Sequence, residues 1–312
     1  MKKSLIAPLC LALSLAVLLA GCSVMDDSVD DPIYVMASFY PLYALAVNVT
    51  EDVPALTLGC LVQPQDGCPR TYALSNWDAA IVAQQDAFII AGRGFESFET
   101  ALNGLSDGPA LLTLLEGRTL RDNGAAVNEE SAHTDGPNPW LFLSVPGAIE
   151  MTLSLGHGLA QMDERYAEDY IENMNGFIMR LELLAGEISA LMTGAPNLPV
   201  ACLHEGLSYF AEECGLTVSA DLSREPGSEP VDNDLEALMN DLAASDARVV
   251  LIEKQAPESL ETALVQAGYA VARLDTLMTH QADGDTEAYE RIMLENARAL
   301  KNALTAANAA DR

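Results

Sequence analysis

Basic residues are scarce in this chain. Its 312 residues include 16 Lys and Arg against 46 Asp and Glu, which gives a formal net charge of −30. Nucleic-acid binding depends on neutralising phosphates with Lys and Arg, so this balance excludes nucleic acid as a partner. Solubility accounts for the acidity, and the attraction to cations is weak because salt screens surface charges.

The sequence also lacks the short motifs that mark common enzymes. It contains no nucleophile elbow, no phosphate-binding loop and no HExxH zinc motif. Internal repeats and long low-complexity tracts are absent as well. Carboxylates and a histidine follow several predicted strands, but no such motif accompanies them. We therefore predict that the chain is not an enzyme.

The N-terminus carries a processing signal. Two lysines precede the apolar run Leu5 to Ala20, and the segment Leu19-Ala20-Gly21-Cys22 resembles a lipobox. We predict a signal peptide at 1–21, lipidation of Cys22 and an acidic tether over 22–32. Lipid chains would hold the protein on the extracytoplasmic side of the cell membrane without a spanning helix. Because 1–21 contains two of the 16 basic residues and no acid, the mature net charge is −32.

No CxxC motif links the cysteines that remain in the mature domain, Cys60, Cys68, Cys202 and Cys214. An even number of cysteines outside the cytoplasm predicts disulfides. The pairs Cys60 with Cys68 and Cys202 with Cys214 would each close a short local loop. A four-cysteine metal site is the alternative, although it would have to join two lobes.

One long helix is predicted over Asp163 to Met192, where apolar residues recur every three or four positions without an interrupting proline. About thirty residues give a rod of roughly 45 Å, longer than one small domain is wide. A coiled-coil strand or a bundle helix are the alternatives. The α/β patterns on both sides favour a helix that joins two lobes, which we name the spine helix.

Strands and helices alternate on both sides of the spine helix, which predicts parallel sheets with helical crossovers. The fold class is therefore α/β, with two lobes that each hold a mostly parallel sheet flanked by helices. The lobes span 33–162 and 193–312, with the spine helix at 163–192. Predicted strands are Ile33–Ser38, Ala55–Leu61, Ala87–Ala91, Ala110–Leu114, Leu198–Leu203, Leu216–Ala220, Val249–Ile252 and Ala270–Leu274. Predicted helices begin at Pro41, Asn76, Ser144, His204, Asp234, Ser259 and Thr286.

Ligands of parallel sheets sit beyond the carboxyl ends of the strands. His204, Glu253 and Asp275 each directly follow a predicted strand. These three residues are therefore candidates for a site between the lobes. His280, in the polar loop after the last strand, could approach this site but is expected to be a surface residue. His157 is expected to be a packed or capping residue of a helix.

Four segments of the chain are similar to those of a known family: Ala37-Ser38-Phe39-Tyr40-Pro41-Leu42-Tyr43, Asp86 to Glu96, His204 to Ala211, and Glu229 to Leu238 followed by Val-Val-Leu-Ile-Glu253. By these segments the chain resembles the metal-binding lipoproteins of ABC importers for zinc and manganese. The resemblance implies an extracytoplasmic solute-binding protein that delivers zinc or manganese to an ABC permease in the membrane. A monomer is expected.

The same resemblance assigns four positions to the metal. His204 matches the family's second-lobe histidine and Asp275 its aspartate. The two first-lobe histidines are changed, because the chain has Pro69-Arg70-Thr71-Tyr72 and Pro137-Asn138-Pro139-Trp140 where the family has Pro-His-x-Tyr and Pro-His-x-Trp. Arginine cannot ligate a cation, and asparagine is a poor substitute for imidazole on zinc.

Three explanations stay open for this degenerate site. Substitute ligands could complete it, since Cys68 lies two residues before Arg70 and His133 five before Asn138. Alternatively, Arg70 pairs with Asp275 in place of the cation and the lobes bind another small polar or anionic solute. In the third, the chain has lost its solute and acts as an adhesion or scaffold lipoprotein. Glu205 and Glu253 are candidates for a supporting role around the site.

Overall fold

The structure is a computed structural model that describes residues 31–102, 108–123, 136–222 and 232–310. Apolar strands form the framework of the fold. Ile33–Arg312 forms one unit and Met1–Pro32 another. The predicted signal peptide, Cys22 and all of the tether except its last two residues lie outside the described residues. Within the described part of the chain, no helix combines the length and the apolar character that crossing a membrane requires.

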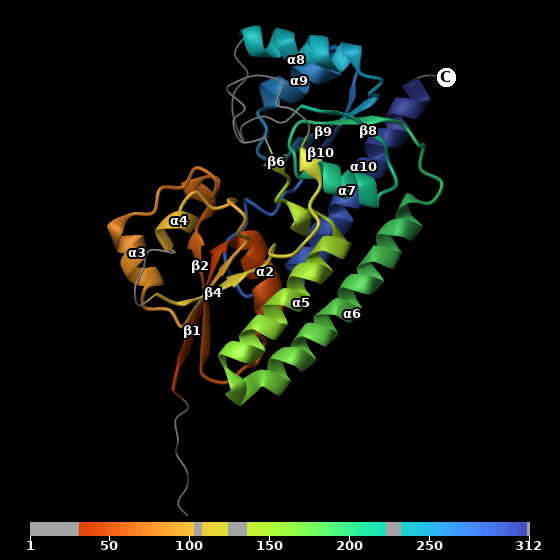
Figure 1. Ribbon diagram of the computed structural model, residues 1–312. Coiled ribbons are helices and arrows are strands. Elements are labelled where there is room, and N and C mark those ends of the chain that lie inside the picture. The colour runs from red at the N-terminus through yellow and green to blue at the C-terminus, as the bar shows by residue number, and fades with distance from the viewer. Residues whose placement is uncertain (1–30, 103–107, 124–135, 223–231, 311–312) are drawn as a thin grey trace, which may run out of the picture. The chain divides into compact units, whose positions relative to one another are not determined.

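Two four-stranded parallel sheets confirm the predicted fold class (Figure 1). The first has the order β2-β1-β3-β4 and the second β10-β9-β7-β8. The strands are β1 (Ile33–Phe39), β2 (Leu56–Val62), β3 (Ala87–Ile90), β4 (Ala110–Thr113), β7 (Val200–Cys202), β8 (Val218–Asp221), β9 (Val249–Glu253) and β10 (Ala270–Leu274). A short antiparallel pair, β5 (Asp122–Asn123) with β6 (Gly136–Pro137), stands apart from both sheets.

Helices connect and cover these strands. Their bounds are α2 (Tyr40–Val49), α3 (Asn76–Val82), α4 (Glu99–Leu102), α5 (Val145–Met162), α6 (Ala167–Met192), α7 (Leu207–Glu213), α8 (Asp232–Ala244), α9 (Glu258–Gln266) and α10 (Ala288–Ala310). Single 3₁₀ turns lie at Pro64–Asp66, Leu141–Leu143 and Glu164–Tyr166. Most predicted elements are confirmed within a few residues. The α7 helix begins three residues later than predicted because His204 to Gly206 form a turn, and Ser75, rather than Asn76, caps α3.

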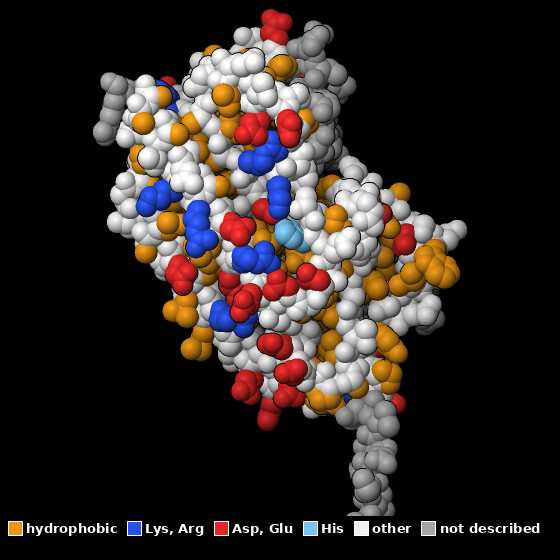
Figure 2. All heavy atoms as spheres, turned by 180° about the vertical axis from the view of Figure 1, so that it is seen from behind, with side chains coloured by type: hydrophobic (Ala, Val, Ile, Leu, Met, Phe, Trp, Pro, Cys, Tyr) orange, Lys and Arg blue, Asp and Glu red, His pale blue; other side chains and the backbone are white. Residues whose placement is uncertain are grey.

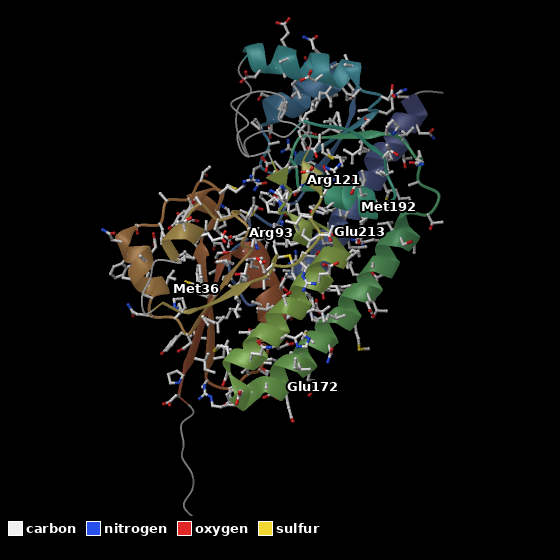
Figure 3. The ribbon with its side chains drawn as sticks, viewed as in Figure 1. Met36, Arg93, Arg121, Glu172, Met192 and Glu213 are labelled. Atoms are coloured by element: carbon white, nitrogen blue, oxygen red, sulfur yellow. The ribbon has the colours of Figure 1, made fainter. Side chains whose placement is uncertain are left out.

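The spine helix is α6, which runs beside α5 and leads to the second sheet (Figure 1). It has 26 residues, or roughly 39 Å, because a 3₁₀ turn at Glu164–Tyr166 precedes it. Glu172 and Met192, labelled in Figure 3, lie near its two ends. Arg180 fastens the helix to α10 through Glu290 at 2.9 Å. The lobe boundaries themselves remain a prediction.

One apolar core reaches both sheets. It contains side chains from β1, β3, α2, α5 and α6 together with one face of β7 and β9 and the buried face of α10. A separate core lies between the other face of the second sheet and helices α8 and α9, with Leu242, Val250 and Leu264 at its centre. Because dense cores resist deformation, a core shared by both sheets restrains large movements between them.

Surface charges are mixed on the face drawn in Figure 2, where acidic and basic side chains lie next to one another around a histidine. Ion pairs between neighbouring side chains in the structure include Arg291 with Asp285 at 2.6 Å and Arg273 with Glu261 at 2.6 Å. Several of the cations in the described residues therefore serve in ion pairs.

Both predicted disulfides are wrong. Cys60, Cys202 and Cys214 carry free thiols, so neither predicted pair is formed. Burial raises the pKa of the Cys60 thiol to about 12 and that of Cys214 to about 12. Cys202 is fully buried at the end of β7 and packs as a small hydrophobic residue.

Gly147, near the start of α5, allows a close approach of the preceding turn. A Cβ at this position would lie 2.1 Å from the carbonyl oxygen of Leu141, a backbone atom that cannot rotate away. We expect Gly147→Ala to lower the free energy of unfolding by about 3 kcal/mol, measured by urea denaturation. Gly176→Ala on α6 is the control, because its Cβ would meet nothing within 4 Å. Gly176→Ala should leave the free energy of unfolding unchanged or raise it by up to about 1 kcal/mol. Equal losses of this free energy for both variants would contradict the prediction.

Candidate functional site

An ion pair between Arg70 and Glu205 joins segments of the two sheet regions. Arg70 lies on a turn held by the carbonyl oxygen of Cys68, which accepts from Thr71 N and Tyr72 N at 3.0 Å each. Glu205 lies in the turn between β7 and α7, and its Oε1 atom also accepts from Trp140 Nε1 at 2.7 Å. The two side chains are only 16% and 8% exposed. Glu205 therefore neutralises a cation that the protein itself supplies.

Aromatic side chains surround this pair. The Arg70 guanidinium lies 5.9 Å from the centre of the Phe95 ring, which in turn contacts Trp140 edge-on at 5.1 Å. Phe95 is held in place because buried Glu96 accepts from Ala91 N at 2.7 Å and Gly92 N at 3.0 Å. The aromatic surroundings exclude water and so strengthen the attraction between the two charges.

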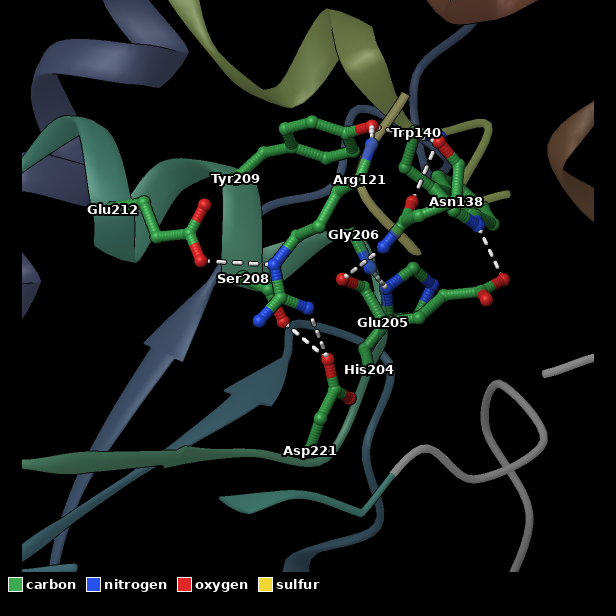
Figure 4. A network of polar contacts seen from close by, with 10 residues as sticks. All are labelled: Arg121, Asn138, Trp140, His204, Glu205, Gly206, Ser208, Tyr209, Glu212 and Asp221. Atoms are coloured by element: carbon green, nitrogen blue, oxygen red, sulfur yellow. Dashed lines mark hydrogen bonds and ion pairs between the residues drawn. The ribbon is translucent and has the colours of Figure 1, made fainter. Parts of the chain in front are cut away.

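Asn138 is fully buried, and both ends of its amide are engaged. Its Nδ2 donates to the Glu205 carbonyl oxygen at 2.8 Å, and its Oδ1 accepts from Trp140 N at 3.1 Å (Figure 4). The side chain thus holds the turn that carries Glu205. Its oxygen would have to leave Trp140 N to ligate a metal.

His204 is 3% exposed and packs edge-on against Trp140 with ring centres 4.4 Å apart. Its Nδ1 accepts from Gly206 N at 3.1 Å, which assigns the proton of the neutral ring to Nε2. Burial, with a smaller effect of Arg70, lowers the pKa of His204 to about 3. The ring is therefore neutral at physiological pH, but in this tautomer it presents no nitrogen lone pair for a metal.

Asp275 has partners of its own, so the open alternative in which Arg70 pairs with it is wrong. Its Oδ2 accepts from Lys254 Nζ at 2.8 Å and contacts His280 Nε2 at 2.9 Å. Its Oδ1 accepts from Leu277 N at 2.8 Å. Burial alone would raise the pKa of Asp275, but the hydrogen bonds from His280 and Lys254 outweigh it and the pKa is lowered.

His280 is therefore not the surface residue that was expected. Its side chain is 24% exposed, and its ring lies 5.3 Å from that of Tyr40. Of the other candidates, Glu253 is buried at the end of β9 and Cys68 is half-buried beside the Arg70 turn. His133 lies outside the described residues. Among the residues that are described, no three or more His, Cys, Asp and Glu side chains are grouped so that they could hold a metal ion.

Comparison with known proteins identifies the family. A family model described as "Zinc-uptake complex component A periplasmic" matches residues 35–303. The chain belongs to this family. The high-affinity zinc uptake system protein ZnuA of Bacillus subtilis is 22% identical to it over 292 residues, which cover 89% of each chain.

Solved structures of similar fold agree with this family. FpvC of Pseudomonas aeruginosa in complex with a nickel ion has a TM-score of 0.74 and 22% identity, covering 88% of this chain and 97% of that chain. A zinc-bound variant of AdcAII from Streptococcus pneumoniae has a TM-score of 0.72 and 21% identity, covering 88% and 99%. The chain is thus an extracytoplasmic solute-binding protein of the zinc/manganese import class, and the prediction that it is not an enzyme is confirmed.

This member of the zinc-uptake component A family contains a second polar network, which the sequence analysis missed (Figure 4). Arg121, which precedes β5, contacts Glu212 of α7 at 2.9 Å and Asp221 of β8 at 3.0 Å. Burial alone would lower the pKa of Arg121, but these two carboxylates outweigh it and the pKa is raised. The only sequence signal was Tyr209, which lies in the same network and within the segment that resembles the family.

Glu213 at the end of α7 makes stability depend on pH. Figure 3 labels it near α5, and its Oε2 accepts from Val145 N of that helix at 2.9 Å while Oε1 is buried with no hydrogen-bond partner. Burial raises its pKa from 4.5 to about 7. A raised carboxyl pKa means that the unfolded chain releases this proton first as the pH rises. The folded state therefore loses stability between about pH 4.5 and pH 7.

We expect Glu213→Gln to remove this loss, because an amide cannot ionise. The urea midpoint of the variant, relative to that of the wild type, should rise from pH 5 to pH 8. Glu187→Gln is the control, since Glu187 is exposed on α6. The difference between its urea midpoint and that of the wild type should not change with pH. A flat difference for Glu213→Gln as well would show that Glu213 ionises normally.

Proposed function

We propose that this chain is the membrane-anchored solute-binding component of a zinc/manganese-class ABC importer in which the protein's own Arg70 takes the place of the metal cation. The buried ion pair of Arg70 with Glu205 is the observation that supports the proposal. A metal ion close to this pair would be repelled by a guanidinium that cannot lose its charge. Degenerate metal binding through substitute ligands, the other expectation from the sequence, gains less support from the geometry.

The remaining family positions support the same conclusion. The amide of Asn138 is held by Glu205 O and Trp140 N. The Nδ1 atom of His204 accepts from Gly206 N, and Asp275 is occupied by Lys254 and His280. A divalent ion would have to displace several hydrogen bonds and the ion pair of Asp275 with Lys254 to reach these donors, each at a cost in free energy.

Zinc and manganese titration by calorimetry tests the proposal. The mature chain is purified with a chelator and then dialysed free of it. We expect no binding event with a Kd below about 10 μM, which corresponds to about −7 kcal/mol. Sub-micromolar binding at one site would contradict the proposal. Cys68→Ser and His133→Ala would then show whether these residues are the substitute ligands.

The solute that replaces the metal should be small and polar or anionic, because Arg70 can exchange Glu205 for another anion. Trp140 reports on this exchange, since its indole donates to Glu205. The chain has two tryptophans; Trp77 is 74% exposed, whereas Trp140 is 1% exposed. In a Trp77→Phe background, small carboxylates and oxyanions that bind should change the Trp140 emission with a saturating dependence. The effect should vanish in Arg70→Gln.

Lipid anchoring at Cys22 is part of the proposal and rests on the lipobox sequence. More than one acyl chain gives stable membrane attachment. Cys22→Ser should move the protein from the membrane fraction to the soluble fraction and abolish fatty-acid labelling. Retention of that variant on membranes without label would rule out the anchor.

A further inference from the structure

The short pair β5 and β6 is fastened to the second sheet by a side chain from α7. Asn138 N, after β6, donates to Arg121 O at 2.7 Å, which continues the β5–β6 pairing. The Tyr209 hydroxyl accepts from Arg121 N at 2.8 Å and donates to Asn138 O at 2.8 Å. This hydroxyl thus bonds to the backbone of both segments.

The Arg121 side chain makes the reciprocal contact. Its guanidinium leaves the β5 segment and reaches Glu212 Oε1 at 2.9 Å and Asp221 Oδ2 at 3.0 Å. Asp221 is itself held by Ser208 Oγ at 2.5 Å. The contacts are therefore reciprocal. Tyr209 of α7 bonds to the β5–β6 pair, and Arg121 beside that pair contacts α7 and β8.

The segments that this arrangement joins come from different parts of the chain. The β5–β6 segment lies between β4 and α5, which belong to the first sheet and its helices, yet the polar contacts of Arg121 and Tyr209 go across to α7 and β8. Charge-assisted hydrogen bonds of this kind are stronger than neutral ones and fix geometry.

We propose that Arg121 and Tyr209 form an interlock that holds the two sheet regions in one relative arrangement without solute. Within it, Arg121 is a positioning residue: it fixes Asn138 through the β5–β6 pairing, and Asn138 in turn holds the Glu205 turn. The interlock does not depend on which solute the protein carries, so it can fail while the proposed function stands.

Hydrogen exchange of the mature chain, read by mass spectrometry without added solute, tests this interlock. We expect Arg121→Gln to raise the exchange rates in peptides covering 136–140 and 205–213 by about tenfold or more, while peptides from β1, β3 and β9 keep their rates. Tyr209→Phe should accelerate the same two regions. The double variant should add little to the larger single effect, because both substitutions break one network.

Arg118→Gln is the matched control. Arg118 also pairs with a carboxylate, Glu150 at 3.6 Å, but both residues belong to the first-sheet region. This variant should leave 205–213 unchanged. In the wild type, 1 M NaCl should raise the exchange rates of 136–140 and 205–213 in part, because salt screens the partly exposed ion pairs. In Arg121→Gln, the same salt should raise these rates little further.

An even rise across all peptides, or no rise in 136–140 and 205–213, would overturn the interlock. If Arg121→Gln does not fold, Arg121→Lys and Tyr209→Phe decide the matter. The lysine keeps the charge but loses the forked geometry that reaches Glu212 and Asp221 together. Arg121→Lys alone should raise the exchange rates of 136–140 and 205–213 less than the double variant with Tyr209→Phe does. Unchanged exchange rates in both Arg121→Lys and Tyr209→Phe would again overturn the proposal.

Discussion

Replacing Arg70 and Asn138 together with histidine should raise zinc affinity by about a thousandfold or more, or about 4 kcal/mol. The substitution removes the guanidinium that neutralises Glu205 and adds two imidazoles near His204. Three imidazoles and a carboxylate are a donor set that suits zinc. His204 must give up its hydrogen bond from Gly206 N to expose a lone pair, which costs about 1 kcal/mol and limits the gain.

The single variants separate the causes. Asn138→His alone should raise affinity by less than about tenfold, because Arg70 still repels the ion, whereas Arg70→His should give most of the increase. Arg118→His with Asn173→His is the control for added imidazoles, since neither residue takes part in the contacts of Arg70, Asn138, His204 or Asp275. Calorimetry in the absence of chelator measures all four. If the double variant binds zinc no better than the wild type, Arg70 and Asn138 do not occupy the family's metal positions.

Glu205→Gln should lower the free energy of unfolding by about 3 kcal/mol, because it leaves the Arg70 guanidinium in a site that is only 16% exposed without its counter-charge. The variant also weakens the hydrogen bond from Trp140 Nε1. Urea denaturation at neutral pH measures the loss. It is the largest stability effect expected for an isosteric substitution in this chain, since it removes charge and leaves shape unchanged.

Two further variants test the cause of that loss. Arg70→Met with Glu205→Met removes both charges and should recover most of the stability, because buried ion pairs are commonly replaced by apolar side chains at little cost. Asp285→Asn breaks an ion pair with Arg291 whose side chains are 35% and 49% exposed. It should cost less than about 1 kcal/mol. A loss of that small size for Glu205→Gln would mean that the Arg70 pair is solvated like a surface pair.

A binding protein can keep its family's fold while its site changes. The Arg70 and Glu205 pair, the amide of Asn138 and the contacts of Arg121 all join the two sheet regions with groups that the chain carries itself. In the proposed function, a permanent internal cation holds together what a bound metal would otherwise hold together. Solute exchange then requires an anion to compete with Glu205, and metal concentration has little influence on it.

The sequence by itself determined the fold class. The parallel strand β3 is short and wholly apolar, and β9 is apolar up to its last residue, Glu253. The helices between the strands have apolar stripes, so local periodicity is enough to predict two parallel sheets and the long α6 helix. It also predicted, by resemblance, that Arg70, Asn138, His204 and Asp275 stand at the family's metal positions, and flanking Pro, Tyr and Trp residues mark the first two.

Only the tertiary structure decided which of these residues meet. Arg70 pairs with Glu205, 135 positions away along the chain, and not with Asp275, which Lys254 and His280 already occupy. The cysteine pairs predicted from spacing do not form. Apart from the position of Tyr209, the network in which Arg121 contacts Glu212 and Asp221 left no signal in the sequence. The physical reason is that charge pairing depends on distance and burial in space, and a side chain's nearest opposite charge is set by how the two sheets pack.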